Sequence, residues 1–413
     1  MLSHELLEDA EKRIRKHRTA DIEFELVSRD GAPHSGADAG ISLARHEFKL
    51  GCNAFKLFGI KDAGLQKGYD DAFANLLNFA TLPFYWGRYE PEKDGERVEE
   101  MEKMVAWCAD HGIATKGHPL AWHEVYPKWA GELDDAEVLK RLEARVLEIV
   151  EHFAGRVDIW DVVNEATVSH RFENAVGRWM KDGGAASCVS EALDWAHDAN
   201  PRAVLLYNDF NVSDAFEALM SELLERRAHV HTCGIQSHMH KEEWPLRKAW
   251  DVCESYSRFG MPLHFTELTI LSGRYKAPDD NDWHARPEGW DSTEEGEKKQ
   301  LEYGSALYTL LFSHPAVEAI TTWDFSDYGA WQAAPAGLIR KDMSPKPFYE
   351  WIYDSFHKTW ATNVSATTDD AGKLTARCYF GEHDLKVRLA SGEERVVRVN
   401  VRRRGLRKMR VVV

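Results

Sequence analysis

Residues 136–166 read AEVLKRLEARVLEIVEHFAGRVDIWDVVNEA and contain one complete helix–strand unit. In the first part, apolar side chains recur at the spacing of one helical face: Val138, Leu142, Val146, Ile149 and Phe153. The segment DIWDVVNEA that follows is a short apolar run, and it ends in Asn164 and Glu165. Buried parallel strands have this composition. We therefore predict a helix that leads into a buried strand with a carboxylate at its carboxyl end.

The same alternation of apolar runs and amphipathic segments extends over residues 46–355. Eight apolar runs are candidate strands: HEFKLGCN, LLNFATLPFYW, ATKGHPLAWH, DIWDVVNEA, AVLLYNDFN, HTCGIQSHMH, MPLHFTELTI and AITTWDFSD. Eight strands with helices between them predict an α/β fold, the closed parallel (β/α)8 TIM barrel. An open doubly wound sheet is the alternative, but no GxGxxG follows the first run.

Both ends of the chain have a different pattern. Residues 20–45 and 360–413 alternate apolar and polar side chains and carry DG, AG and SG turn pairs. Neither end has enough strands to be stable alone, so we expect the two ends to form one small β module. The predicted parts are residues 1–45 (a helix and strands), 46–355 (the catalytic barrel) and 356–413 (strands that pack with the N-terminal segment).

The last twenty residues are rich in arginine, a composition that nucleic-acid-binding patches share. Between residues 397 and 402, however, valines alternate with Arg398, Asn400 and Arg402. This alternation favours a half-exposed β-hairpin. The formal charge of the whole chain is −16. Such an acidic protein repels phosphate backbones, so we expect no nucleic-acid partner.

Neither a membrane nor a disulfide framework is expected. No run of 18 apolar residues occurs, and the opening MLSHELLEDAEKRIRKHR lacks the apolar core of a signal peptide. These features predict a cytoplasmic protein with no membrane partner, or a secreted one if a leader has been removed. The six cysteines show no metal-binding spacing and are interpreted as buried thiols in a reducing compartment. A disulfide between Cys233 and Cys253 is the alternative.

Two glutamates stand out at the carboxyl ends of the candidate strands, where a barrel of this kind has its active site. Glu165 ends the fourth strand and Glu267 ends the seventh, in a chain with 15 Trp, 13 Tyr and 18 Phe. Aromatic faces combined with short polar groups suit sugars. Two carboxyl groups can hydrolyse an acetal, because one protonates the leaving oxygen and the other meets the oxocarbenium-like centre.

Several motifs at the strand ends resemble those of glycoside hydrolase family 10, the endo-β-1,4-xylanases. The acid/base motif is matched by WDVVNEA at 160–166 and the nucleophile motif by TEL at 266–268. Further matches, in the same order, are GHPLAWH at 117–123, LYNDFN at 206–211, GIQSH at 234–238, Trp323, Asp327 and Trp331, and PKPF at 345–348. The resemblance covers about residues 46–355.

This resemblance implies a retaining hydrolase of xylan or xylo-oligosaccharides. Glu165 would be the general acid/base and Glu267 the nucleophile, with carboxyl groups roughly 5 to 5.5 Å apart. The resemblance assigns sugar binding in the cleavage subsite to Asn164 and His118. It implies that Gln236 and His238 touch or orient the nucleophile, and that Trp122, Trp323 and Trp331 form the aromatic walls. The expected partner is a β-linked oligo- or polysaccharide, and no cofactor or metal is expected.

One segment departs from the family pattern. The family has a Glu-Asn pair and a Lys after its second strand, whereas residues 78–91 here read NFATLPFYWGRYEP. Tyr85, Arg88 and Glu90 are candidate replacements as sugar contacts, and Tyr85 and Trp86 could equally be packing. Asp324 stands where the family has glycine. Another β-glycan is therefore an alternative substrate.

Two other classes of function remain as alternatives. A carbohydrate-binding barrel without catalysis would keep the fold but lose hydrolysis through the altered second loop. A metal-dependent barrel hydrolase is suggested by His238 and His240, which form an HxH at a strand end. The first strand offers only Cys52 and Asn53 as polar partners for such a site. The oligomeric state is open.

Overall fold

The computed structural model describes residues 2–389 and 391–413, and it consists of two compact units. The barrel unit contains Leu50–Gly304 and Ala316–Lys346. The terminal unit contains Met1–Lys49, Ser305–Pro315 and Pro347–Val413. The part boundaries inferred from the sequence, at residues 45 and 356, stay a prediction.

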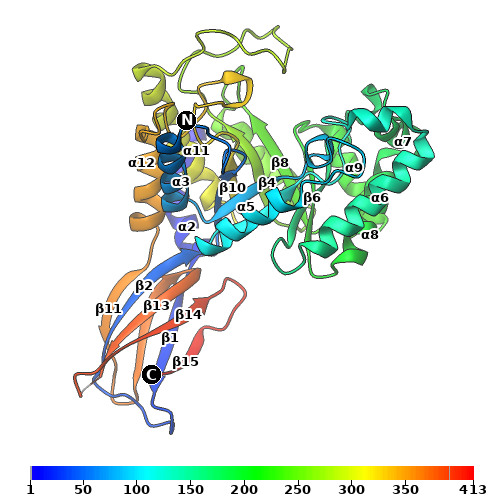
Figure 1. The fold of residues 1–413 in the computed structure, drawn as a ribbon. Coiled ribbons are helices and arrows are strands. Elements are labelled where there is room, and N and C mark those ends of the chain that lie inside the picture. The colour runs from blue at the N-terminus through cyan, green and yellow to red at the C-terminus, as the bar shows by residue number, and fades with distance from the viewer. Residues whose placement is uncertain (1, 390) are drawn as a thin grey trace. The chain divides into compact units, whose positions relative to one another are not determined.

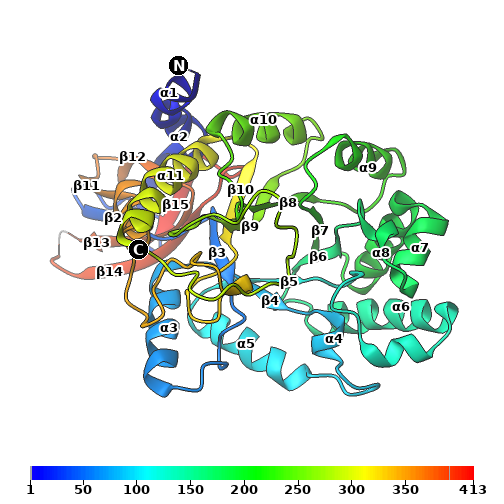
Figure 2. The same cartoon turned by 90° about the horizontal axis from the view of Figure 1, so that it is seen from above.

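Eight parallel strands close into a barrel, which confirms the predicted fold class (Figure 2). Their order around the barrel is β10-β3-β4-β5-β6-β7-β8-β9. In chain order the strands are β3 (Lys49–Asn53), β4 (Phe79–Pro83), β5 (Ala114–His118), β6 (Ile159–Asn164), β7 (Val204–Asp209), β8 (Thr232–His238), β9 (Leu263–Thr269) and β10 (Val317–Thr322). Seven of them lie within the apolar runs identified in the sequence, and β10 begins two residues before the eighth run.

Helices follow the strands along the chain. They are α3 (Ala63–Leu76), α4 (Trp86–Tyr89), α5 (Val98–Asp110), α6 (Asp135–His152), α7 (Ala175–Gly183), α8 (Ala185–Ala199), α9 (Asp214–Glu225), α10 (Leu246–Ser257), α11 (Glu294–Ser313) and α12 (Pro347–Asp354). Helix α6 buries Val138, Leu142, Val146 and Ile149, as the sequence pattern predicted. Asp134 caps its N-terminus by accepting a hydrogen bond from the backbone N–H of Glu137, which satisfies one of the free donors there.

A glycine on β5 leaves space for a large buried side chain on the neighbouring strand β6. Trp160 on β6 is completely buried, and its register partner on β5 is Gly117. A Cβ atom at residue 117 would lie 2.0 Å from the Trp160 ring. The glycine therefore makes room for the tryptophan between neighbouring strands.

The terminal unit is built from both ends of the chain, as predicted. Strand β1 (Thr19–Val27) lies between β12 (Lys373–Tyr379) and β15 (Lys408–Val412) in a three-stranded sheet. Figure 1 shows β1, from the start of the chain, beside β15, from its end. The second sheet has the order β11-β2-β13-β14, with β11 (Asn363–Thr367), β2 (Asp38–His46), β13 (Gly381–Arg388) and β14 (Glu394–Val401). One apolar cluster joins the two sheets, and helices α1 (Leu2–Glu8) and α2 (Ala10–Arg18) precede β1.

The structure corrects the predicted C-terminal hairpin. Val399 and Val401 are buried and Arg398 is exposed, so the alternation was interpreted correctly. Strand β14, however, pairs with β13, while β15 pairs in parallel with β1 in the other sheet. Alternation specifies which face of a strand is buried, and it leaves the partner strand open.

All six cysteines are buried free thiols, so the alternative disulfide between Cys233 and Cys253 is not present. Within the described residues, no helix combines the length and apolar character that crossing a bilayer requires.

Candidate active site

The backbone places Glu165 directly after strand β6. Its φ angle is 59°, in the left-handed region that non-glycine residues rarely adopt. The backbone N–H of Glu165 donates to the carbonyl oxygen of Asn208 on the neighbouring strand β7, at 2.8 Å. Strain of this kind is tolerated where surrounding contacts enforce it, and it is concentrated at functional sites.

Neutral donors hold the carboxyl group of Glu165. Gln236 Nε2 and Asn164 Nδ2 donate to its Oε1 at 2.9 and 3.0 Å, and Trp122 Nε1 lies 3.3 Å from Oε2. Burial raises the pKa of Glu165 well above its ordinary value, and the negative charge of Glu267 adds to this effect, while the hydrogen bond from Gln236 opposes it. A carboxyl group in this environment keeps its proton and can act as an acid.

Glu267 belongs to strand β9, and only 4% of its surface is exposed. Its Oε1 accepts a hydrogen bond from Asn208 Nδ2 at 2.8 Å, and its Oε2 lies 3.0 Å from His238 Nε2. Burial lowers the pKa of His238 to about 3, so this imidazole is neutral. Because the Thr269 hydroxyl lies 3.0 Å from Nδ1 and can donate to it, Nε2 can carry the single proton that Glu267 receives.

A buried chain of charges lies behind Glu267. His118 Nε2 is 3.8 Å from Glu267 Oε1, and His118 Nδ1 is 2.8 Å from Asp161 Oδ2. The ammonium group of Lys116 donates to the same Asp161 oxygen. Burial raises the pKa of Glu267 above its ordinary value, and the interactions with His118 and Lys116 oppose this rise in part. This chain therefore favours the carboxylate form of a group that burial alone would protonate.

Three amide side chains connect the two glutamates. Asn208 Nδ2 bridges Glu267 Oε1 and Asn164 Oδ1, both at 2.8 Å. Gln236 Nε2 bridges Asn164 Oδ1 at 3.1 Å and Glu165 Oε1 at 2.9 Å. The two carboxyl groups therefore belong to one hydrogen-bonded site. Gln236 donates directly to Glu165, and it is linked to the nucleophile Glu267 through Asn164 and Asn208 and not by a direct hydrogen bond.

Aromatic side chains surround this pair. The Trp323 ring lies 5.5 Å from His118 and 5.8 Å from His238, and the Trp331 ring lies 4.8 Å from His238. On the other side, the Tyr85 ring lies 5.3 Å from His118 and 5.6 Å from Trp122. Every aromatic residue expected at the site is thus connected to a glutamate directly or through one histidine.

The sequence matches known proteins over most of the barrel. The family model of glycosyl hydrolase family 10 matches residues 81–355. The chain belongs to this family. The endo-1,4-beta-xylanase B of Thermotoga neapolitana is 29% identical over 278 residues, which are 64% of this chain and 75% of that protein.

Solved structures of family 10 enzymes agree with the fold. The native xylanase 10B from Thermotoga maritima is 26% identical, with a TM-score of 0.64 over 76% of this chain and 96% of that one. The xylanase 10B from Thermotoga petrophila RKU-1, crystallised with xylobiose, is 25% identical, with a TM-score of 0.63 over 76% and 95% of the two chains. The match to the family makes this chain a glycoside hydrolase.

In the segment that departs from family 10, some side chains face the site and others pack within the surrounding structure. Tyr85 is 6% exposed and faces the site, and the guanidinium of exposed Arg88 lies 5.1 Å from the centre of its ring. Trp86 points elsewhere, because its Nε1 donates to Glu90 at 2.8 Å and its ring packs on Trp129. Glu90 is thus engaged in local structure, which does not support its expected role as a sugar contact.

Asp324, the other departure from family 10, follows strand β10 and is 7% exposed. Its Oδ1 accepts a hydrogen bond from the backbone N–H of Trp331 at 2.9 Å. Burial raises its pKa to about 7, although this hydrogen bond and the charge of Lys56 act in the opposite direction. Asp324 therefore fixes the backbone from which the Trp331 ring projects.

Two polar residues of the site were not singled out from the sequence as functional: Lys116 and Asp161. Asp161 could have been found, because it stands between apolar residues of β6 and a buried charge needs a partner, which Lys116 on β5 supplies. Asn208 lies in the LYNDFN match near the end of β7, where polar side chains were expected to line the active-site mouth.

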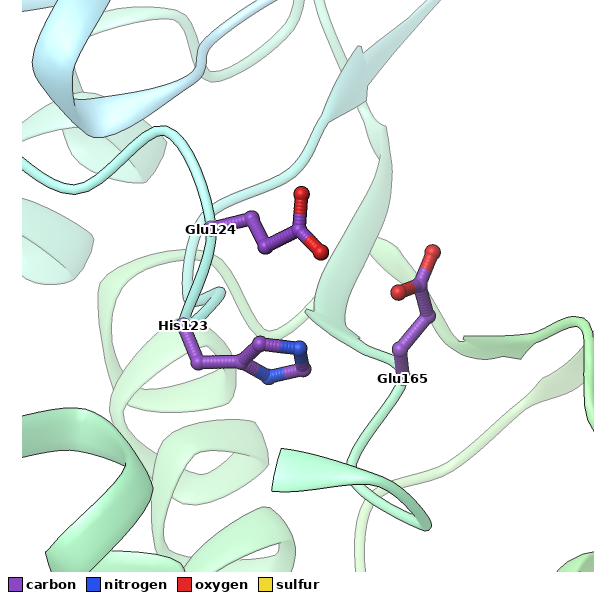
Figure 3. A group of neighbouring side chains, drawn as sticks. All are labelled: His123, Glu124 and Glu165. Atoms are coloured by element: carbon purple, nitrogen blue, oxygen red, sulfur yellow. The ribbon is translucent and has the colours of Figure 1, made fainter. Parts of the chain in front are cut away.

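One cluster of side chains could hold a metal ion. His123, Glu124 and Glu165 converge as Figure 3 shows, and one ligand atom from each lies within 4.8 Å of the others. His123 is 1% exposed, and neither ring nitrogen has a hydrogen-bond partner. The HxH pair of the metal-hydrolase alternative is not part of this cluster. His238 is bound to Glu267, and the His240 ring packs against Trp331.

Proposed function

We propose that this chain is a retaining hydrolase of β-1,4-linked xylan or xylo-oligosaccharides, with Glu165 as acid/base and Glu267 as nucleophile. The observation that carries the proposal is the joint hydrogen-bond network of the two glutamates, in which neutral donors surround Glu165 and a buried charge chain supports Glu267. Burial raises the pKa of both carboxyl groups, and only at Glu267 does a buried cation, the Lys116 ammonium, oppose the rise.

In the first step, Glu267 attacks the anomeric carbon while Glu165 transfers its proton to the glycosidic oxygen, and the carbon–oxygen bond breaks. The product is a covalent glycosyl-enzyme and a free leaving chain. In the second step, Glu165, now a carboxylate, takes a proton from water as the water oxygen attacks the same carbon. Glu267 leaves, and the two inversions give retention of configuration.

The substrate assignment is supported by the relatives. The curated relative from Thermotoga neapolitana is named a xylanase, and the Thermotoga petrophila enzyme was crystallised with xylobiose. Departures at Tyr85, Arg88 and Asp324 leave room for another β-linked glycan. Products should therefore be compared on xylose-based and glucose-based oligosaccharides, and xylose-based substrates should give the higher kcat/KM.

Replacement of the proposed nucleophile is the decisive experiment. Glu267→Ala should lower kcat on xylo-oligosaccharides by about 10⁴-fold or more, because no other group can form the covalent intermediate. Binding of the same oligosaccharides, measured by calorimetry, should persist. Glu191→Gln, an exposed change on α8, is the control and should leave both properties intact. Unchanged turnover in Glu267→Ala would refute the mechanism, and an inverted first product by NMR would refute retention.

A second variant tests the acid. Glu165→Gln should greatly lower kcat/KM, which reports the first step, on xylo-oligosaccharides but lower it much less on dinitrophenyl β-xylobioside, whose leaving group needs no proton. Equal losses on both substrates would remove Glu165 from the role of acid. A wild-type protein that binds oligosaccharides and cleaves none would instead favour the carbohydrate-binding alternative.

A further inference from the structure

We propose that Trp283 is an additional sugar-binding platform. It extends the aromatic wall of the site to a sugar unit that lies farther from the cleaved glycosidic bond. This inference rests on the proposed action on β-linked chains and names one residue that sets chain-length preference. Trp283 lies in the long segment between β9 and α11, and 39% of its surface is exposed.

A continuous series of contacts leads from the nucleophile to this ring. His238 Nε2 lies 3.0 Å from Glu267 Oε2, and the Trp331 ring lies 4.8 Å from the His238 ring. The Trp283 ring follows at 6.1 Å from Trp331, with an angle of 13° between the two planes. Two nearly parallel indoles, stepped outward from the reacting centre, offer successive surfaces for the C–H faces of sugar rings.

A buried histidine supports both rings. His240 has no exposed surface, and it meets Trp331 at 5.1 Å and 86° and Trp283 at 6.1 Å and 77°. Both edge contacts come from one imidazole, so the two indoles share a common support. Burial keeps the pKa of His240 well below its ordinary value, and the support is therefore neutral.

Lysines fix the segment that carries Trp283. Lys276 is 5% exposed, and its Nζ donates to the Asp282 carbonyl at 2.7 Å and to Gln332 Oε1 at 3.0 Å. It thereby ties the residue before Trp283 to the residue after Trp331. The Nζ atoms of Lys276 and Lys241 also lie 5.3 and 5.5 Å from the centre of the Trp283 ring.

These contacts explain why so large an apolar ring is held in place while much of it remains in contact with water. A ring that only packed the loop would gain more from full burial. A ring that is fixed in advance and still exposed binds a sugar with little loss of conformational freedom.

The test uses the full chain and oligosaccharides of increasing length. Trp283→Ala should raise KM for xylopentaose and xylohexaose about tenfold, and it should leave kcat/KM for 4-nitrophenyl β-xyloside unchanged. Trp283→Phe should restore part of the loss, because it keeps an aromatic face. Leu224→Ala on α9 removes an equally exposed apolar side chain elsewhere, and it should change neither value.

The outcomes separate this inference from the proposed function. Hydrolysis of xylo-oligosaccharides with the same length dependence in wild type and Trp283→Ala would overturn the platform and leave the hydrolase assignment intact. A tenfold loss on the monosaccharide glycoside as well would show a role in holding the reacting centre and would also overturn the platform. Should the wild type cleave no oligosaccharide, the platform is tested by calorimetric titration with xylohexaose. Equal affinity of the wild type and Trp283→Ala for xylohexaose would refute the platform.

Discussion

Glu165 combines two features that are each unusual for a glutamate: a left-handed backbone and a pKa raised by burial. The backbone turn directs the side chain toward Gln236 and away from the strand axis. Neutral amide and indole donors satisfy the carboxyl oxygens without supplying a full positive charge. The side chain therefore remains protonated over a wider pH range than an exposed glutamate, which is what an acid catalyst needs near neutrality.

Glu124 tunes this acid. Its negative charge is one of the causes that raise the pKa of Glu165. In Glu124→Gln that charge is removed, so the pKa of Glu165 falls and its protonated fraction is lost at lower pH. The alkaline limb of the kcat/KM profile should move to lower pH. The pH profile of kcat/KM on 4-nitrophenyl β-xylobioside checks this direction. An alkaline limb that stays at the same pH or moves to higher pH would contradict the prediction.

Strands β5 and β6, which carry residues of the site, pack so closely that a single added methyl group should disturb them. Gly117→Ala would place a methyl group 2.0 Å from the Trp160 ring, so one of the strands must shift. We expect a loss of about 1–3 kcal/mol in the free energy of unfolding, measured by chemical denaturation. Gly131→Ala, which meets no atom within 4 Å, is the control. A stable Gly117→Ala protein would show that the strands can separate freely.

At the level of elements, sequence periodicity could predict the eight strands and the two glutamates, because strand ends in a parallel barrel meet at one mouth. It could not predict the partner of Gln236. The register between β8 and β9 shifts between Ile235 and Gln236, and a similar shift occurs between Asp161 and Val163 on β6. Such irregularities redirect side chains within one or two residues, and no local sequence pattern marks them here.

The order of strands in the terminal unit was harder to infer for a related reason. Its valine alternation fixed which residues are buried, but strand partners depend on long-range pairing between the two ends of the chain. Strand β15 pairs with β1, some 385 residues earlier, with Leu26 opposite Val411. Two ends that are far apart in sequence therefore depend on each other for a folded core.

Across the whole chain, this dependence can be tested at two adjacent residues of the last strand. Val411 is 4% exposed within the core of the terminal unit, and Val412 on the opposite face is 55% exposed. Val411→Asp should cost about 2–4 kcal/mol of stability, because a carboxylate without a partner enters an apolar core. Val412→Asp should change stability by less than about 0.5 kcal/mol. Denaturation followed by circular dichroism compares the two, and equal effects would mean that the last strand does not complete the core begun by the first.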